Sequence, residues 1–139
     1  MATTYPLEVV TPERVMLSED VIETTAPGTE GYLGILAHHA AIMSELAPGE
    51  VRVTLADGRT TARIVIAGGF LEMSPEGRAT ILADSAERAD EIDLTRAEAD
   101  LAAARQLLDG AEAGSPQQLQ ARSALAHAET RIRVGRGER

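Results

Sequence analysis

The sequence predicts an α+β protein, with an N-terminal β-sandwich of about ten strands followed by a C-terminal antiparallel hairpin of two helices. Two observations predict this fold class. Through residue 85, short runs rich in Val, Ile, Leu and Thr alternate with Gly, Pro and Asp turns, as strands do. From residue 86 onward Gly and Pro become sparse, and Ala, Leu, Glu, Asp and Arg recur at helical spacing. We therefore expect a sandwich over residues 1–85 and a helix–turn–helix arm over residues 86–139.

The strands are located by their turn signals. Asp57-Gly58 is the strongest hairpin signal, because both residues tolerate positive φ. Pro27-Gly28, Pro48-Gly49 and Pro75-Glu76-Gly77 punctuate the chain in the same way. Strands are expected between these signals, at residues 5–10, 15–17, 20–25, 32–36, 51–55, 60–67, 70–73 and 79–82. Eight to ten strands at spacings of about 8–12 residues favour a sandwich or a flattened barrel, in which closure or a second sheet removes most exposed edges.

Two helices are predicted in the arm, each with its own start signal. Asp93 is expected to cap the first helix. Ser115 is expected to cap the second, with Pro116 at the first helical position and Gln118 three residues after the cap. The apolar stripes are Leu94, Ala97, Leu101, Ala104 and Leu108 on the first helix, and Ala121, Leu125, Ala128 and Ile132 on the second. Because these stripes hold few large side chains, we expect a detachable arm that needs a surface to rest on.

Charge excludes some functions and is unevenly spread. The chain has a net charge of −9, and all 13 of its basic residues are Arg. This charge disfavours nucleic acid as a partner, because phosphates need clustered cations. Residues 116–139 differ from the rest, since five Arg and two Glu give them a net charge of +3. The end of the arm therefore carries the opposite sign to the remainder of the chain.

The sequence shows no catalytic or metal-binding constellation. It has no Cys, so disulfides and thiolate chemistry are excluded. It has no Lys to end a phosphate-binding loop, and no Gly-x-Ser-x-Gly nucleophile motif. His38 and His39 are adjacent, so in a strand they would point to opposite faces, and we expect no metal site. With no signal peptide and no apolar run of about 20 residues, we expect a soluble chain that is monomeric when isolated.

Four short strings carry a family resemblance. They are Gly31-Tyr32-Leu33-Gly34-Ile35-Leu36, His39-Ala40, Gly68-Gly69-Phe70-Leu71-Glu72 and Thr80-Ile81-Leu82-Ala83-Asp84. Occurring in this order before a helical hairpin, they resemble the ε subunit of the F-type ATP synthase. The likeness covers the chain from residue 5 to about residue 134.

The resemblance implies a non-catalytic subunit of the central stalk, placed between the rotating γ subunit and the membrane ring of c subunits. There it would couple proton-driven rotation to ATP synthesis, and its hairpin would restrain ATP hydrolysis by the α/β subunits. The expected location is peripheral, at the cytoplasmic face of a bacterial cell membrane or the equivalent face of an energy-coupling organelle. The membrane would be met only through the complex, and no cofactor is required.

The resemblance also assigns residues to the inhibitory contact. In the family the extended arm approaches an acidic segment of the catalytic subunits. The end of the arm is basic here because of Arg122, Arg131, Arg133 and Arg136. Charge complementarity would then favour the inhibitory position. The alternative is that these side chains form an ordinary solvated helix face.

Some members of the family bind ATP in the folded arm. Their motif Ile-Asp-x-x-Arg-Ala and its companion positions correspond here to Ile92, Asp93, Arg96, Ala97, Glu87 and Arg131. His127 stands where a second Arg is expected. Because neutral His supplies one donor where Arg supplies a planar cationic fork, we expect ATP binding to be weak or pH-sensitive. The alternative is that Asp93 is simply the helix cap and Arg96 its neighbour.

A loop at the rim of the sandwich departs from the family. The residues around His39 lack the usual Pro, Gly and Pro, and Tyr32 replaces an acidic residue. Since the family uses this rim against the c-ring, Glu30, Tyr32 and His38 are the expected contacts with that ring.

Two alternative functions, from other functional classes, remain to be distinguished from a stalk subunit. A freestanding ATP-sensing module with the same fold would open its arm in the absence of ATP. A small hydrolase built on the acidic residues would turn over substrate as an isolated chain. Co-purification separates the first from a stalk subunit, because only the stalk subunit predicts a stable one-to-one complex with γ.

Overall fold

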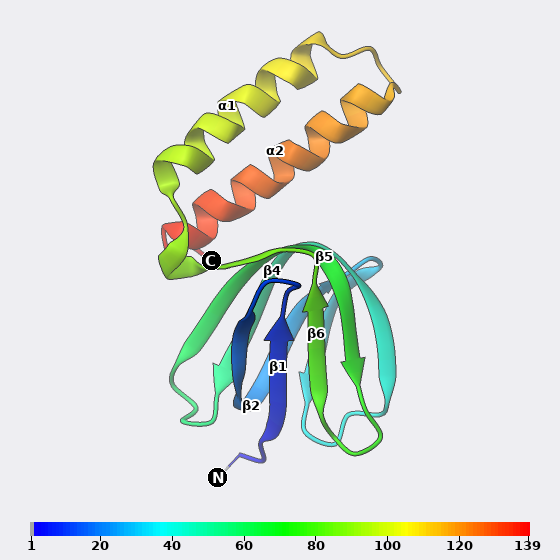
Figure 1. Ribbon diagram of the computed structural model, residues 1–139, viewed down its shortest axis with the longest axis vertical. Coiled ribbons are helices and arrows are strands. Elements are labelled where there is room, and N and C mark those ends of the chain that lie inside the picture. Colours follow the sequence, from blue (N-terminus) through cyan, green and yellow to red (C-terminus); the bar gives the residue numbers. More distant parts are fainter. Residues whose placement is uncertain (1) are drawn as a thin grey trace. The chain divides into compact units, whose positions relative to one another are not determined.

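The computed structural model describes residues 2–139 and divides the chain into two compact units. The first, which we call the β-unit, extends to Arg88, and the second, the helical arm, covers Ala89–Arg139. Each unit has its own elements and its own buried residues (Figure 1). The sequence analysis expected the change at residue 85. Ala86–Arg88 forms a short strand, β7, which pairs with Ile64–Ile66 and so belongs to the β-unit.

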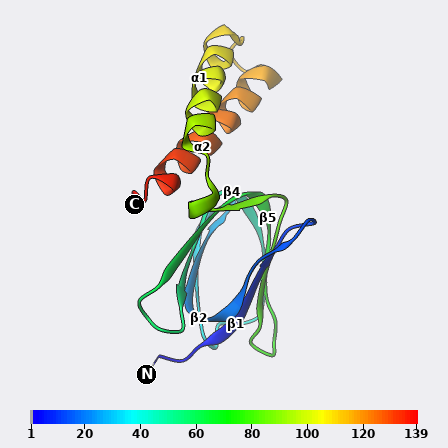
Figure 2. The ribbon, with the colours of Figure 1, turned by 60° about the vertical axis from the view of Figure 1, so that its left-hand side comes forward.

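The β-unit is one closed sheet of seven strands. In chain order these are β1 (Tyr5–Val10), β2 (Val15–Gly28), β3 (Gly31–Leu36), β4 (Ile42–Leu55), β5 (Thr61–Met73), β6 (Ala79–Ala83) and β7 (Ala86–Arg88). The strands are ordered β1-β6-β5-β4-β2-β3, with β7 on β5. Because β1 also pairs with β2, the sheet closes on itself as a flattened barrel, seen as two facing layers in Figure 2. Closure removes most free edges, as expected from the strand spacing.

The expectation of about ten strands is wrong, because three expected interruptions lie inside continuous strands. Strand β4 continues through Pro48-Gly49, and β5 continues through Gly68-Gly69. The break expected after residue 17 lies within β2. The register of β2 against β4 shifts near Pro27, so a turn residue marks an irregularity within a long strand. Gly and Pro favour bulges and bends as well as turns, so their presence alone does not end a strand.

The long strands change partners along their length and thereby contribute to both layers. The first part of β2 pairs with β1 and its last part with β3 and β4. Likewise β5 pairs with β7 near Ile64–Ile66 and with β6 from Gly69 onward. The core between the layers is aliphatic, and its largest fully buried side chains include Leu7, Ile35, Ile64, Ile66, Leu71, Met73 and Ile81.

The helical arm begins with a short 3-10 turn, η1 (Ala89–Glu91), and consists of α1 (Leu94–Gly110) and α2 (Pro116–Gly135). The expected caps are confirmed. The Asp93 side chain accepts a hydrogen bond from the backbone N–H of Arg96 at 3.0 Å, and Ser115 Oγ accepts one from Gln118 N at 3.1 Å. Pro116 occupies the first turn of α2, as its fixed φ favours.

The seam between α1 and α2 is built from small residues. The buried alanines are Ala97, Ala104, Ala121 and Ala128, spaced seven residues apart on each helix. The leucines of both stripes are only half-buried, while Leu107 and Leu119 are exposed. Where the end of α2 meets the start of α1, Gly135 packs closely against side chains, and a Cβ there would lie 2.8 Å from Leu94 Cδ2. The arm therefore buries little apolar surface for its length.

Candidate functional site

Three residues of the Ile-Asp-x-x-Arg-Ala motif have structural partners within the arm. Ile92 lies against Gly135, Asp93 caps α1, and Ala97 is fully buried. These contacts give each of them a role that needs no ligand, as the capping alternative supposed. The fourth, Arg96, projects from the first turn of α1 with its side chain 75% exposed. Arg96 is therefore the motif residue most accessible to a ligand.

Arg96 and Arg131 converge on one carboxylate. Asp100 lies one turn after Arg96 on α1, with Arg96 Nε 3.8 Å from Asp100 Oδ1. From α2, Arg131 Nη1 donates to Asp100 Oδ2 at 3.1 Å. The Arg131 side chain is only 11% exposed, whereas that of Asp100 is half exposed. The structure thus brings together two of the expected ATP-site cations, and it adds an acid that sequence reasoning missed.

The other expected ATP-site residues divide between the two units. His127 lies on α2 one turn before Arg131, so the two share a helix face. Glu87 lies in β7 of the β-unit, opposite Val65 of β5. Of this set, the structure therefore brings Arg96 and Arg131 together through Asp100, while Glu87 belongs to the β-unit.

The four arginines expected at the inhibitory contact do not form one cluster. Arg131 donates to Asp100, and Arg136 Nη2 donates to Glu98 Oε1 at 3.0 Å. Both thereby tie α2 to α1. Arg122 and Arg133 lie about three turns apart on α2, nearly on one line along the helix. Arg122 is exposed and Arg133 is half-buried, so Arg122 is the member of this set best placed to meet another protein.

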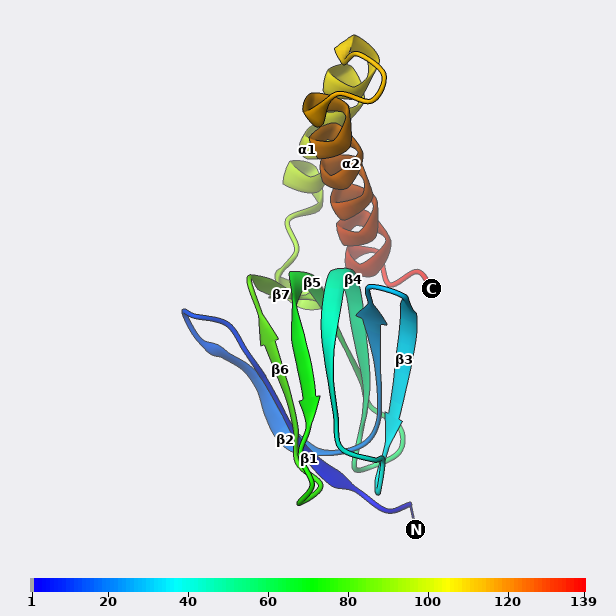
Figure 3. The same cartoon turned by 90° about the vertical axis from the view of Figure 1, so that its right-hand side faces the viewer.

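The residues expected at the c-ring lie at opposite ends of β3 (Figure 3). Glu30 is in the tight turn before β3, and Tyr32 is beside it near the start of the strand. His38 follows the end of β3 and has a φ of 67°, in the left-handed region that favours glycine. All three are exposed. Because a six-residue strand is about 17–20 Å long, one rim offers Glu30 with Tyr32 and the other offers His38.

An exposed apolar surface on the β-unit was missed by the sequence analysis. Val10 pairs with Leu82, Leu82 with Phe70, and Val10 also with Val15. Directly paired residues share a face of the sheet, and the alternate residues on these strands fill the core. Phe70, Leu82 and Val15 are each more than half exposed. We call Val10, Val15, Phe70 and Leu82 the outer stripe. Alternation within each strand could have indicated its members, but only strand pairing aligns them.

The outer stripe is flanked by acids. Glu45 lies directly opposite Phe70 on β4. Glu8 and Glu72 both pair with Thr80 of β6, two residues before Leu82. The three carboxylates are exposed. The surface therefore combines an apolar centre with an acidic edge, which suits a partner that presents apolar and basic side chains.

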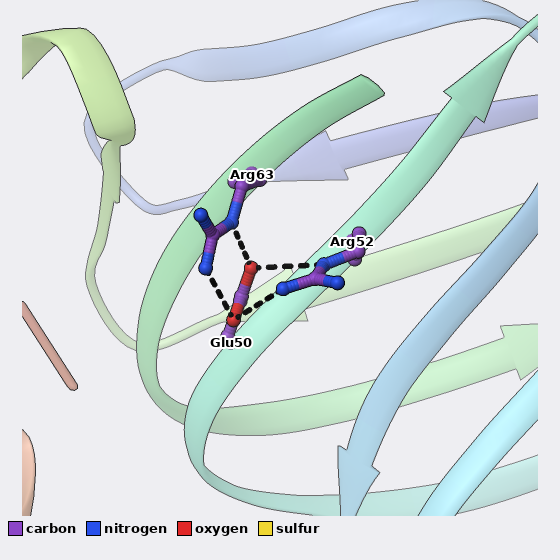
Figure 4. Close-up of polar contacts among 3 residues, drawn as sticks. All are labelled: Glu50, Arg52 and Arg63. Atoms are coloured by element: carbon purple, nitrogen blue, oxygen red, sulfur yellow. Dashed lines mark hydrogen bonds and ion pairs between the residues drawn. The ribbon is translucent and has the colours of Figure 1, made fainter. Parts of the chain in front are cut away.

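A second missed feature is a buried carboxylate between two arginines of β4 and β5 (Figure 4). Arg52 and Arg63 lie directly opposite each other across these strands, where like charges repel. Glu50 accepts from both: from Arg52 Nε at 3.2 Å, and from Arg63 Nε together with Arg63 Nη2, the latter at 3.2 Å. Glu50 is only 4% exposed. Its paired, forked contacts offset the cost of burying the charge and join the two strands.

Residues 2–139 lack two features that would bear on function. Within that range, no cluster of three or more His, Asp and Glu side chains is arranged to hold a metal ion. Neither α1 nor α2 is long and apolar enough to cross a membrane.

Both units match family models of known proteins. Residues 4–89 match the model described as ATP synthase, Delta/Epsilon chain, beta-sandwich domain. Residues 90–135 match the model described as ATP synthase, Delta/Epsilon chain, long alpha-helix domain. The two models meet within one residue of the boundary between the β-unit and the helical arm.

Individual relatives agree with these matches. The ATP synthase epsilon chains of Brucella anthropi and Brucella suis are each 43% identical over 111 residues, covering 80% of this chain and 81% of theirs. A chain in a structure of the Euglena gracilis mitochondrial ATP synthase, OSCP/F1/c-ring, aligns with a TM-score of 0.80 and 27% identity over 94% of this chain and 80% of that one. A chain of the Tetrahymena thermophila mitochondrial ATP synthase central stalk and c-ring shares the fold, with a TM-score of 0.64 and 16% identity over 96% and 98% of the chains.

Proposed function

The chain belongs to the ATP synthase delta/epsilon chain family, and we propose that its β-unit serves as the foot of the central stalk while its arm regulates hydrolysis. It is an epsilon-type subunit and not the catalytic one. The observation that carries this function is that both family domains match in order over residues 4–135. The role is to couple proton-driven rotation to ATP synthesis in a complex with γ, the c-ring and the α/β subunits.

The outer stripe is proposed as the surface that meets γ. A stalk subunit that transmits torque needs an apolar contact that stays dry, and Phe70, Leu82 and Val15 offer one. The acidic edge of Glu8, Glu45 and Glu72 favours a partner with basic side chains around an apolar centre. A second copy of this chain would bring its own acidic edge against this one, and the like charges would repel. The surface is therefore better suited to γ than to self-association.

Contact with the c-ring is proposed for the ends of β3. Glu30 and Tyr32 form one candidate rim and His38 the other. Through this contact the chain is associated with the membrane as part of the complex. The cytoplasmic face of a bacterial cell membrane, or its equivalent in an energy-coupling organelle, is the proposed side.

The arm is proposed as the regulatory element. Its seam of alanines, which buries little apolar surface, makes it a weakly held element, suited to two positions. Arg122, which is exposed, is the proposed leading contact with an acidic surface of the α/β subunits. Arg131 and Arg136 reach that surface only if they leave Asp100 and Glu98.

Weak ATP binding in the arm is proposed as a regulatory signal. It is supported by the convergence of Arg96 and Arg131 and by the position of His127 one turn away. Protonation of a His adds a cation, so binding should tighten as the pH falls. No cofactor is needed for the stalk function itself. A freestanding ATP-sensing module is the second candidate, supported by the same cluster of cations.

Co-expression with γ tests the proposed function and separates the two candidates. A stalk subunit forms a stable one-to-one complex in gel filtration, and Leu82→Glu in the outer stripe should weaken it at least tenfold. Leu119→Glu is the matched control, because Leu119 is an equally large, exposed leucine on the arm. A chain that elutes alone under all conditions would favour the freestanding module. An equal loss of γ binding in both variants would contradict the assignment of the outer stripe as the contact with γ.

A further inference from the structure

Asp100 occupies the position between the two guanidinium groups that are proposed to hold phosphate. It reaches Arg96 along α1 and Arg131 across the hairpin, at 3.8 Å and 3.1 Å. The two contacts use different oxygens, Oδ1 for Arg96 and Oδ2 for Arg131. A carboxylate that bridges two arginines presents two oxygens to them, much as a phosphoryl group does.

We infer that Asp100 is a built-in competitor for the anionic ligand of Arg96 and Arg131. This inference rests on the proposed ATP site and concerns the regulation of that site. An anion such as a nucleoside triphosphate must displace the Asp100 carboxylate, or share the two arginines with it. Asp100 thus sets the ligand concentration at which the arm responds.

The charges support competition. Two guanidinium groups and one carboxylate leave a net charge of +1, whereas the arginines without Asp100 would present +2. Removing one unit of like charge about 4 Å from a bound anion changes its affinity about fivefold in water and more where solvent is limited. Solvent is limited around Arg131, because its side chain is only 11% exposed.

Burial also indicates that Asp100 can be displaced. Its side chain is 50% exposed, so it can rotate into water at little cost while Arg131 stays in place. An anion that carries several negative charges attracts the two guanidinium groups more strongly than one carboxylate does, so it can replace Asp100.

A neighbouring ion pair provides a matched control. Glu98 also lies on α1, is 54% exposed, and accepts from Arg136 of α2 at 3.0 Å. Asp100→Asn and Glu98→Gln each remove one negative charge and one cross-helix ion pair. Only the first removes a carboxylate from between Arg96 and Arg131. A general effect of net charge or of hairpin stability would appear in both variants alike.

The test is a calorimetric titration of the full chain and the two variants with ATP and, separately, with inorganic tripolyphosphate. We expect Asp100→Asn to bind both anions about five- to tenfold more tightly than the unmodified chain, and Glu98→Gln to differ by less than twofold at 0.1 M salt. Adding Arg131→Gln to Asp100→Asn should abolish the gain. Circular dichroism confirms that each variant keeps its helices.

The outcomes distinguish this inference from the proposed function. No gain for Asp100→Asn with either anion, or an equal gain for Glu98→Gln, overturns the inference. A gain with tripolyphosphate but no binding of ATP by any variant supports the competitor and refutes the nucleotide site. Tight ATP binding by the unmodified chain that Asp100→Asn leaves unchanged supports the nucleotide site and refutes the competitor.

Discussion

At the scale of single residues, Tyr5 ties together strands that are distant in the sequence. Its hydroxyl is hydrogen-bonded to Thr24 Oγ1 of β2 at 2.7 Å and donates to the Ile35 carbonyl of β3 at 2.9 Å. Tyr5 is 3% exposed. Burial raises the pKa of the Tyr5 hydroxyl above its ordinary 10.0, and the hydrogen bond with Thr24 opposes part of this rise. The folded chain therefore keeps this proton at a pH where the unfolded chain has lost it.

We predict a loss of stability at alkaline pH that depends on Tyr5. As the pH rises from about 10 through the pKa of Tyr5 in the folded state, the unfolded chain binds fewer protons, so the free energy of unfolding falls. The chain has no Lys or Cys to titrate in the same range. Urea unfolding across pH 8–11.5 or so measures the effect. Tyr5→Phe should be less stable by about 1–2 kcal/mol at neutral pH but should lack much of the alkaline fall.

Tyr32→Phe is the control for this prediction. Tyr32 is 61% exposed, so its replacement should leave the alkaline fall in place. An identical fall in Tyr5→Phe and in the unmodified chain would contradict the assignment.

At the scale of elements, β5 depends on a glycine where its partner on one edge changes from β7 to β6, while β4 stays paired on the other edge. Gly69 has a φ of 148°, and a Cβ there would lie 2.0 Å from the Leu82 carbonyl oxygen and 2.8 Å from Ala83 Cα. Both neighbours are backbone atoms of β6 and cannot rotate away. Gly69 therefore permits the close pairing that aligns Phe70 with Leu82 in the outer stripe.

Gly69→Ala is expected to destabilise the β-unit by about 2–4 kcal/mol, because it combines a backbone clash with an unfavourable φ. It should also weaken binding to γ by displacing Leu82. Gly34→Ala is the matched control, since Gly34 lies in β3 with open space around its Cβ position. Thermal unfolding of the two variants checks this, and equal melting temperatures would show that β6 moves freely.

At the scale of the whole molecule, the two units differ in how they are held together. The β-unit closes its sheet around an aliphatic core, and Glu50 with its two arginines braces β4 against β5. The helical arm relies on small buried alanines and on the two cross-helix ion pairs that Asp100 and Glu98 make. This contrast fits a rigid foot with a movable regulatory arm.

For the assembled complex, we predict that Arg122→Gln relieves inhibition of ATP hydrolysis about two- to fivefold, and more at low salt, because one charge at the contact is lost. Arg105→Gln removes the same charge from an exposed position on α1 and should leave hydrolysis unchanged. Steady-state hydrolysis by complexes reassembled with each variant measures the difference. Equal rates for the two variants would point to net charge instead of a contact at Arg122.

Local interactions explain which features could be predicted from sequence. The caps at Asp93 and Ser115 bond to backbone groups three residues away, so the signal and its effect lie within one turn. The change from strand to helical periodicity is local in the same sense. The family strings added the stalk function, which no spacing of residues would have shown.

Contacts between residues far apart in the sequence decided the features that could not be predicted. Pro48-Gly49 and Gly68-Gly69 are compatible with either a turn or a bulge. Pairing with neighbouring strands is what keeps them within β4 and β5. Phe70 and Leu82 become one surface through strand register. Asp100 meets Arg131 across 31 residues of chain. The amino-acid sequence by itself determined the change from strands to helices and the two helix caps, because these depend on contacts within a turn, and its short strings indicated the family. Strand number, the outer stripe and the Asp100 bridge arose only in the tertiary structure, where the packing of distant segments chooses among local conformations of similar free energy.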